Sequence, residues 1–146
     1  MSEIGWRTVQ TVQDAEALMH AVDGFHDSCL KELRYVSGAY MTRNGMSPTN
    51  DRRVLFVMIE TPRGALELAF SGLQTLRLSP ATPDYTCEIL DASLFVNDDG
   101  VVWCDSALSA QQIDFYDGTV ICADALRYRL WNGPTGKADV YASAQR

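Results

Sequence analysis

The chain has 146 residues, of which 47% are hydrophobic and 21% charged, and its formal net charge is −7 at pH 7. This length and composition fit one globular domain, residues 1–146, and exclude intrinsic disorder. No run approaches the roughly 18 apolar residues that a membrane-spanning helix requires. Arginine and lysine are scattered and form no stripe that could follow a phosphate backbone, which argues against nucleic acid as a partner.

The N-terminal segment Met1–Trp6 lacks the basic patch and the apolar core of a signal peptide. We therefore expect a soluble, cytoplasmic chain. An acidic surface promotes solubility, and this is the interpretation that we favour for the net charge. The alternative is that the charge steers a basic protein partner toward the chain.

The first predicted element is a helix from about Val12 to Val22. Thr11 and Asp14 stand three positions apart at its start, which is the spacing of a capping box. Apolar residues inside the segment recur at helical spacing and give the helix one apolar face. Gly24 is expected to end it.

After Gly24 the apolar residues follow the pattern of strands. Seven strands are predicted: Cys29–Tyr40, Arg53–Thr61, Ala65–Phe70, Leu73–Leu78, Thr86–Val96, Val101–Ser106 and Thr119–Trp131. Tight turns such as Pro62–Gly64 and Asn97–Gly100 favour antiparallel pairing between strands that follow one another. Two longer loops, Met41–Arg52 and Ser79–Tyr85, interrupt the series.

These elements predict an α+β domain with one N-terminal helix packed on a strongly twisted, mainly antiparallel sheet of six to eight strands. The short connections favour a meander, in which consecutive strands are neighbours. The sheet is expected to curl into a half-barrel or to split into two layers. Asp139–Ala142 is expected to pair at a sheet edge.

His26, Asp27, Ser28 and Cys29 follow one another where the helix is expected to give way to the first strand. Such a boundary supports a functional residue and leaves it reachable. Neighbouring side chains of an extended strand point to opposite faces, so the local sequence does not pair His26 with Asp27, and it makes no base–nucleophile pair with Ser28. We favour a structural histidine that hydrogen-bonds to backbone at this junction. A binding or catalytic site is the alternative.

Three aspartates, Asp91, Asp105 and Asp124, lie in otherwise apolar runs, although aspartate disfavours strands. Paired carboxylates could perform acid–base chemistry or hold a divalent cation. Acids in strands more often lie on a solvated face or at an edge. Arg127 and Arg129 share one face of the last predicted strand and could neutralise some of them. We favour the structural explanation, and no cofactor or metal site is expected.

The cysteines are Cys29, Cys87, Cys104 and Cys122. Their spacing contains no C-x-x-C pair, which structural zinc sites and thiol redox pairs usually show. Each lies in an apolar, strand-like run, so we expect buried, reduced thiols. Disulfides or a metal are the alternatives.

Several stretches of the chain carry a resemblance to a known family: Phe25–Glu32, Ser37–Tyr40, Met46–Asp51, Phe70–Leu73, Tyr85–Ile89 and Ala125–Arg129. Together they resemble a family of small uncharacterised bacterial proteins, over about residues 25–131. This resemblance implies no activity and assigns no catalytic residue. An acidic α+β domain that opens its first strand with His26 and Asp27 is also similar, more distantly, to immunity proteins of bacterial toxin systems.

Two hypotheses for the function follow. The first is a non-enzymatic binding protein of immunity or inhibitor type, whose acidic surface meets a basic partner. The second is a small enzyme or ligand-binding domain with a pocket around His26 and Asp27. A deep pocket that contains His26 and another titratable group would favour the second. A flat acidic face would favour the first, and a large symmetric contact would favour self-association.

Overall fold

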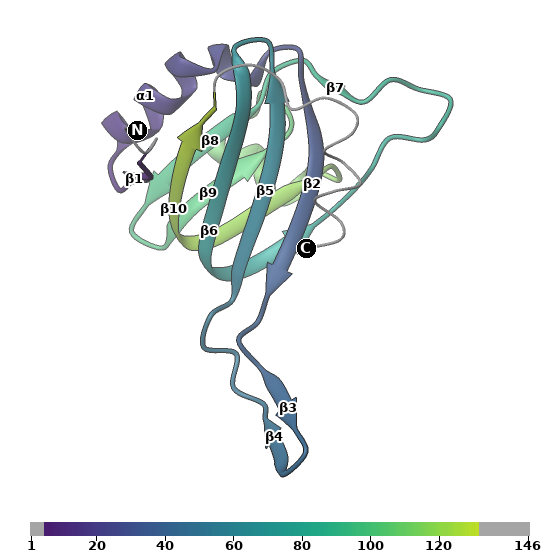
Figure 1. Ribbon diagram of the computed structural model, residues 1–146. Helices are drawn as coiled ribbons and strands as arrows, with labels where there is room; N and C mark the ends of the chain where they lie inside the picture. The colour runs from purple at the N-terminus through teal and green to yellow at the C-terminus, as the bar shows by residue number, and fades with distance from the viewer. Residues whose placement is uncertain (1–4, 132–146) are drawn as a thin grey trace.

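The computed structural model describes residues 5–131, which form an α+β domain (Figure 1). Its elements in chain order are β1 (Arg7–Val9), α1 (Val12–Ala21), the 3₁₀ helix η1 (Asp23–Phe25), β2 (Ser28–Val36), β3 (Tyr40–Thr42), β4 (Gly45–Ser47), β5 (Val54–Thr61), β6 (Gly64–Arg77), β7 (Glu88–Ile89), β8 (Ser93–Asn97), β9 (Gly100–Cys104), the 3₁₀ helix η2 (Ala110–Phe115) and β10 (Val120–Leu130). The pairing predicted for Asp139–Ala142 lies outside the described residues.

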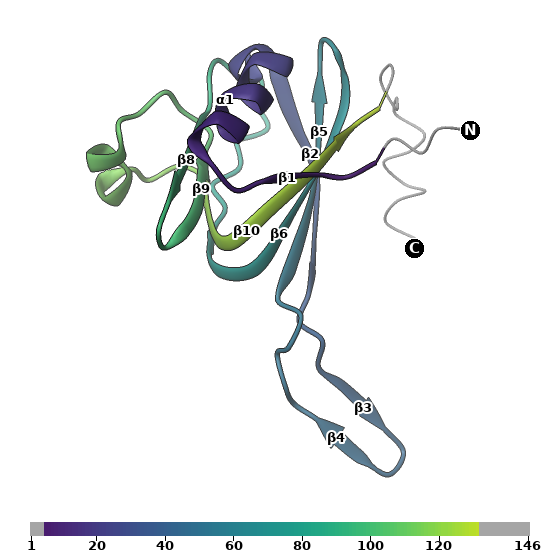
Figure 2. The same cartoon turned by 90° about the vertical axis from the view of Figure 1, so that its left-hand side faces the viewer.

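Within residues 5–131 the main sheet has eight strands in the order β7-β2-β5-β6-β10-β9-β8, with β1 added along β10. Every pairing in it is antiparallel. The sheet curls strongly into a half-barrel, and α1 lies inside the curl beside β8 and β1 (Figure 2). The predicted fold class, an N-terminal helix on a curled antiparallel sheet, is confirmed.

The meander prediction is only partly right. β2, β5 and β6 follow one another in space, as do β8, β9 and β10, but β10 lies between β6 and β9 and joins the two series. β7 pairs with β2 on the opposite side of the sheet from β8, its successor in the chain. Thr86–Val96 is therefore not one strand, because the chain crosses the open side of the curl between Ile89 and Ser93.

The two strands predicted over Ala65–Phe70 and Leu73–Leu78 are one strand, β6. The segment Ser71–Gly72 is a bend within it, where Gly72 has φ +63. The partner strand β10 shifts register between Cys122 and Ala123, close to the same place. Such irregularities increase the twist of a sheet, and here they help to curl it.

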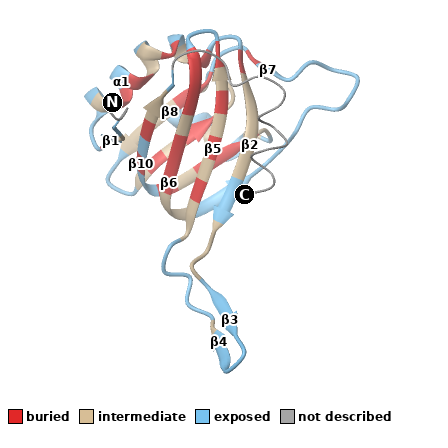
Figure 3. Cartoon of the chain, viewed as in Figure 1, coloured by how far each residue is buried: buried red, intermediate tan, exposed pale blue. Residues whose placement is uncertain are grey.

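The segment Met41–Arg52, predicted as a loop, contains most of a second small sheet, the hairpin of β3 and β4. This hairpin projects away from the body, and its residues are mostly exposed (Figures 1 and 3). The strand predicted over Cys29–Tyr40 accordingly ends earlier, at Val36. Gly38, with φ +99, marks the departure of the hairpin from the sheet.

The helix α1 has the predicted capping box. Thr11 Oγ1 accepts a hydrogen bond from the Asp14 N–H at 3.0 Å, and Asp14 Oδ2 accepts from the backbone N–H groups of Gln10 at 2.9 Å and Thr11 at 3.1 Å. These hydrogen bonds lower the pKa of Asp14, and the one from Gln10 contributes most. At the other end, Arg63 donates to the carbonyls of His20 and Ala21. The helix ends at Ala21, one residue before the predicted boundary at Val22.

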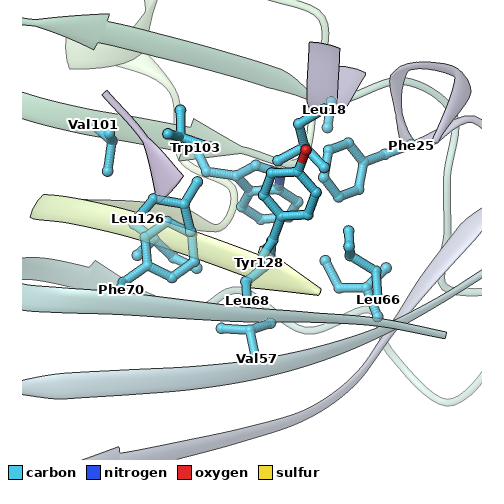
Figure 4. Close-up of a cluster of buried hydrophobic side chains, with 14 of the residues drawn as sticks. Leu18, Phe25, Val57, Leu66, Leu68, Phe70, Val101, Trp103, Leu126 and Tyr128 are labelled. Atoms are coloured by element: carbon cyan, nitrogen blue, oxygen red, sulfur yellow. The ribbon is translucent and has the colours of Figure 1, made fainter. Parts of the chain in front are cut away.

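The core fills the space between α1 and the concave face of the sheet (Figure 4). Buried residues alternate along β5, as a sheet with one face on the core requires (Figure 3). Phe25 and Trp103 pack edge to face with ring centroids 5.7 Å apart, and both are buried. This contact anchors the turn after α1 to the far part of the sheet.

The prediction of buried thiols is wrong for one cysteine. Cys104 is buried and Cys29 and Cys122 are half-buried, but Cys87 is exposed. Cys87 precedes β7 and lies outside its short pairing with β2, so no neighbouring strand covers it.

Candidate functional site

The turn between α1 and β2 has an unusual backbone. Asp23, Gly24 and Phe25 have φ values of 52°, 64° and 63°, and Asp27 has φ 58°. These angles lie in the left-handed region, which is unfavourable for residues other than glycine. Tertiary contacts must therefore hold the turn, and burial of Phe25 against Trp103 is the first of them.

Backbone hydrogen bonds fasten the same turn to the segment between β7 and β8. The Asp27 N–H donates to the Ile89 carbonyl at 2.8 Å, and the Ala92 N–H donates to the Gly24 carbonyl at 2.9 Å. Ser28 then pairs with Ile89 in the sheet. Two segments more than 60 residues apart are thereby fixed side by side.

His26 lies at the centre of this contact. Its Nδ1 is 2.6 Å from the Leu90 carbonyl oxygen and 3.6 Å from Asp91 Oδ1, and its Nε2 is 3.5 Å from Asp27 Oδ2. The expectation that His26 and Asp27 point apart is wrong, because the left-handed backbone at Asp27 breaks the alternation of an extended strand.

The surroundings of His26 favour its charged form. The hydrogen bond to the Leu90 carbonyl raises the pKa of His26 above 6.5, and the carboxylates of Asp27, Asp91 and Asp23 raise it further. The side chains of His26, Asp27 and Asp91 are 49%, 60% and 57% exposed. We call this surface, made of Asp23, His26, Asp27, Leu90 and Asp91, the acidic junction.

Ser28 is not available at this surface. The residue is fully buried, and its hydroxyl has no hydrogen-bond partner among the residues that the structure describes. A nucleophile must be reached by its substrate, so the buried hydroxyl does not complete a catalytic pair with His26.

Asp105 belongs to a different part of the molecule. It accepts a hydrogen bond from the Tyr116 hydroxyl. The pKa of Tyr116 is raised, mainly by burial and next by this hydrogen bond. Asp105 also lines a cavity of about 320 Å³ at the open side of the curl, together with Leu30, Cys87, Ile89, Trp103 and Thr119. The loop between β6 and β7 forms part of the same wall.

Asp124 acts as a cross-link at the bend of β6. It accepts a hydrogen bond from Gln74 Nε2 at 2.8 Å and lies 3.6 Å from Arg53 Nη2. A Cβ at Gly72 would lie 2.2 Å from Asp124 Oδ2, so the carboxylate fills the space that glycine leaves. The carboxylate of Asp124 is thus used within the fold.

The predicted neutralisation of strand aspartates by Arg129 does not occur. Arg129 Nε donates to Glu67 Oε1 at 2.7 Å, and its guanidinium carbon lies 4.5 Å from the ring centroid of Trp6 and 4.9 Å from that of Trp131. Arg127 lies over the Trp6 ring. Both arginines lie on the convex face of the sheet. Aromatic rings, and not the three aspartates, are their neighbours there.

The structure therefore brings together His26, Asp27 and Asp91, with Ser28 buried beside them, and places Asp105 and Asp124 elsewhere. Sequence reasoning missed Asp23 and the exposed Leu90, because their position depends on how the chain pairs β2 with β7. Among residues 5–131 no group of three or more His, Cys, Asp or Glu side chains is arranged to hold a metal ion.

Comparison of the chain with protein-family models, with curated proteins and with solved structures finds no match. Across the described range, no helix is both long enough and apolar enough to cross a membrane.

Proposed function

We propose that this chain is a non-enzymatic binding protein, of immunity or inhibitor type, which binds a basic protein partner at the acidic junction. One observation carries the proposal: three exposed carboxylates, those of Asp23, Asp27 and Asp91, surround one half-exposed imidazole. Even a protonated His26 balances only one of the three charges.

The junction also offers an exposed apolar side chain. Leu90 is 67% exposed, it precedes Asp91, and its carbonyl contacts His26. An exposed leucine in an acidic surface suits a partner segment in which lysine or arginine flanks an apolar residue. The net charge of −7 adds long-range attraction for such a partner.

Backbone rigidity supports the same proposal. The hydrogen bonds from Asp27 to Ile89 and from Ala92 to Gly24 fix both halves of the junction before any partner arrives. A surface that is already ordered loses less conformational entropy on binding, and more of the contact energy is available as affinity.

Capture of partners on the immobilised full chain, followed by mass spectrometry, tests the proposal. The junction variant Asp27→Asn/Asp91→Asn should lose at least about tenfold of the affinity for a captured basic protein, since two charged contacts are removed. The control Asp98→Asn/Asp99→Asn makes the same change in net charge at the β8–β9 turn and should keep most of the affinity. Equal losses in both variants, or no basic protein bound, would contradict the proposal.

The alternative of a pocket around His26 and Asp27 stays a prediction. The cavity beside Asp105 and another of about 430 Å³ beside Asp124 include neither His26 nor Asp27 in their lining. The cytoplasmic location and self-association also remain predictions. The same capture experiment separates self-association from a different partner, because it would return a second copy of this chain.

A further inference from the structure

Two cysteines that lie 58 positions apart in the sequence meet at the edge of the sheet. Cys29 is in β2 directly opposite Glu88 of β7, and Cys87 is the residue before Glu88. Residues opposite each other in an antiparallel pair have Cα atoms roughly 4.5–5.5 Å apart. Cys87 lies just before β7, outside the paired residues, so the alternation of side chains in a paired strand does not direct it away from Cys29. A disulfide requires Cα atoms roughly 4.4–6.8 Å apart.

The two side chains also contact each other. Burial raises the pKa of the Cys29 thiol, and its interaction with the Cys87 thiol, which includes a hydrogen bond between them, raises it further. Cys29 is half-buried, whereas Cys87 is exposed. One sulfur is thus open to a reagent from solvent, and the other lies behind it.

We propose that Cys29 and Cys87 form a reversible disulfide when the protein meets a hydroperoxide. The Cys87 sulfur attacks one peroxide oxygen and becomes a sulfenic acid, and the O–O bond breaks with release of water. The Cys29 sulfur then attacks the Cys87 sulfur, an S–S bond forms, and a second water leaves. With hydrogen peroxide, two thiols and one peroxide give one disulfide and two water molecules.

The other two cysteines lack this arrangement. Cys104 is buried and donates to the Ser106 carbonyl at 3.3 Å, and Cys122 is half-buried in β10. They serve as internal controls for the reaction. The Cys29–Cys87 disulfide would also tie one wall of the cavity beside Asp105 to the sheet, because Cys87 and Glu88 line that cavity and Cys29 belongs to β2.

The test treats the reduced full chain with equimolar hydrogen peroxide, alkylates the remaining thiols under denaturing conditions and maps the peptides. The number of alkylated thiols should fall from four to two, and the linked peptide pair should contain Cys29 and Cys87. Dithiothreitol should restore all four. The Cys104→Ser and Cys122→Ser variants should form the same link, whereas Cys29→Ser and Cys87→Ser should not.

Three results would overturn the proposal: oxidation of Cys87 to the sulfinic acid without a link, a link between two chains, or a link to Cys104 or Cys122. The wild-type peptide map decides without any variant, so failure of a variant to fold does not affect the outcome. Peroxide treatment of the chain in denaturant supplies the reference. The Cys29–Cys87 link should lose its preference there, because the β2–β7 pairing that selects it is gone.

Discussion

The acidic junction and the bend of β6 each combine a glycine with an aspartate, but the aspartate has a different role in each. Each places a glycine of nearly equal φ, +64 at Gly24 and +63 at Gly72, beside an aspartate that is distant in sequence. At the bend, the carboxylate of Asp124 fills the space over the glycine and is bound by Gln74 and Arg53. At the junction, a Cβ on Gly24 would lie 3.8 Å from Asp91 Oδ1, and that carboxylate faces solvent beside His26.

The difference separates charges that hold the fold from charges that are available to a partner. Sequence composition does not distinguish them, since both are an aspartate in an apolar run. What distinguishes them is the number of donors that the surrounding backbone and side chains direct at the carboxylate.

The largest effect is expected from removing the anchor of the junction. Phe25→Ala should lower the free energy of unfolding by roughly 3–5 kcal/mol, because it deletes a buried ring and leaves a cavity against Trp103. Phe115→Ala is the matched control, since that ring is 89% exposed and should contribute little. Urea unfolding curves measure both. Similar, small losses would mean that the junction does not depend on the core.

The two glycines give the most direct comparison. Gly24→Ala should lower stability by about 1 kcal/mol, which is the cost of a left-handed backbone alone. Gly72→Ala should lower it by about 2–4 kcal/mol, because the new methyl group would overlap Asp124 and displace it. Chemical unfolding of both variants measures the difference. Equal losses would show that the contact with Asp124 adds nothing to the backbone strain.

Asp124 and Asp91 should also differ in how much they contribute to stability. Asp124→Ala removes the acceptor for Gln74 and the partner of Arg53, and it should lower stability by about 1 kcal/mol, a modest value because the side chain is largely exposed. Asp91→Ala should leave stability within about 0.5 kcal/mol, the range for surface substitutions. The reverse order in thermal melts would make Asp91 the structural residue.

The smallest effect is the dependence of stability on pH at His26. Its pKa in the folded chain is raised above the 6.5 expected for the unfolded chain. The stabilisation is therefore complete below pH 6.5 and is lost as the pH rises through the folded-state pKa. The melting temperature of the wild type should fall over this interval relative to His26→Gln. A titration of the imidazole by NMR that shows a pKa below 6.5 would contradict the assignment.

Some local sequence signals predicted local features correctly. The capping box of Thr11 and Asp14 depends on neighbours a few positions away, and it is present at the start of α1. The change of period near Gly24 falls between α1, which ends at Ala21 and not at Gly24, and β2, which begins at Ser28. The segment Ser71–Gly72 is different, because the same residues suit a turn or a bend. Its conformation is decided by pairing with β10, some 50 residues later.

The candidate site could be predicted only in part for the same reason. The adjacency of His26 and Asp27 is visible in the sequence, and Asp91 is conspicuous as an aspartate in an apolar run, although it lies between β7 and β8 and not in the strand predicted there. Their meeting depends on the register between β2 and β7, which pair through only two residues. The short strand β7 gives almost no periodic signal, so neither Leu90 nor the direction of Asp27 could be inferred.

The central position of β10 also bears on how the domain forms during synthesis. This strand pairs with β6 along its length, with β9 at its beginning and with β1 toward its end. A nascent chain that has emerged only as far as Gly118 therefore has three strands that lack their shared neighbour. Unpaired apolar strands invite association between chains, so ribosomes stalled before Val120 would release a product prone to aggregation. Within residues 5–131, β10 is the final strand to be synthesised, and it closes the sheet and joins its two halves.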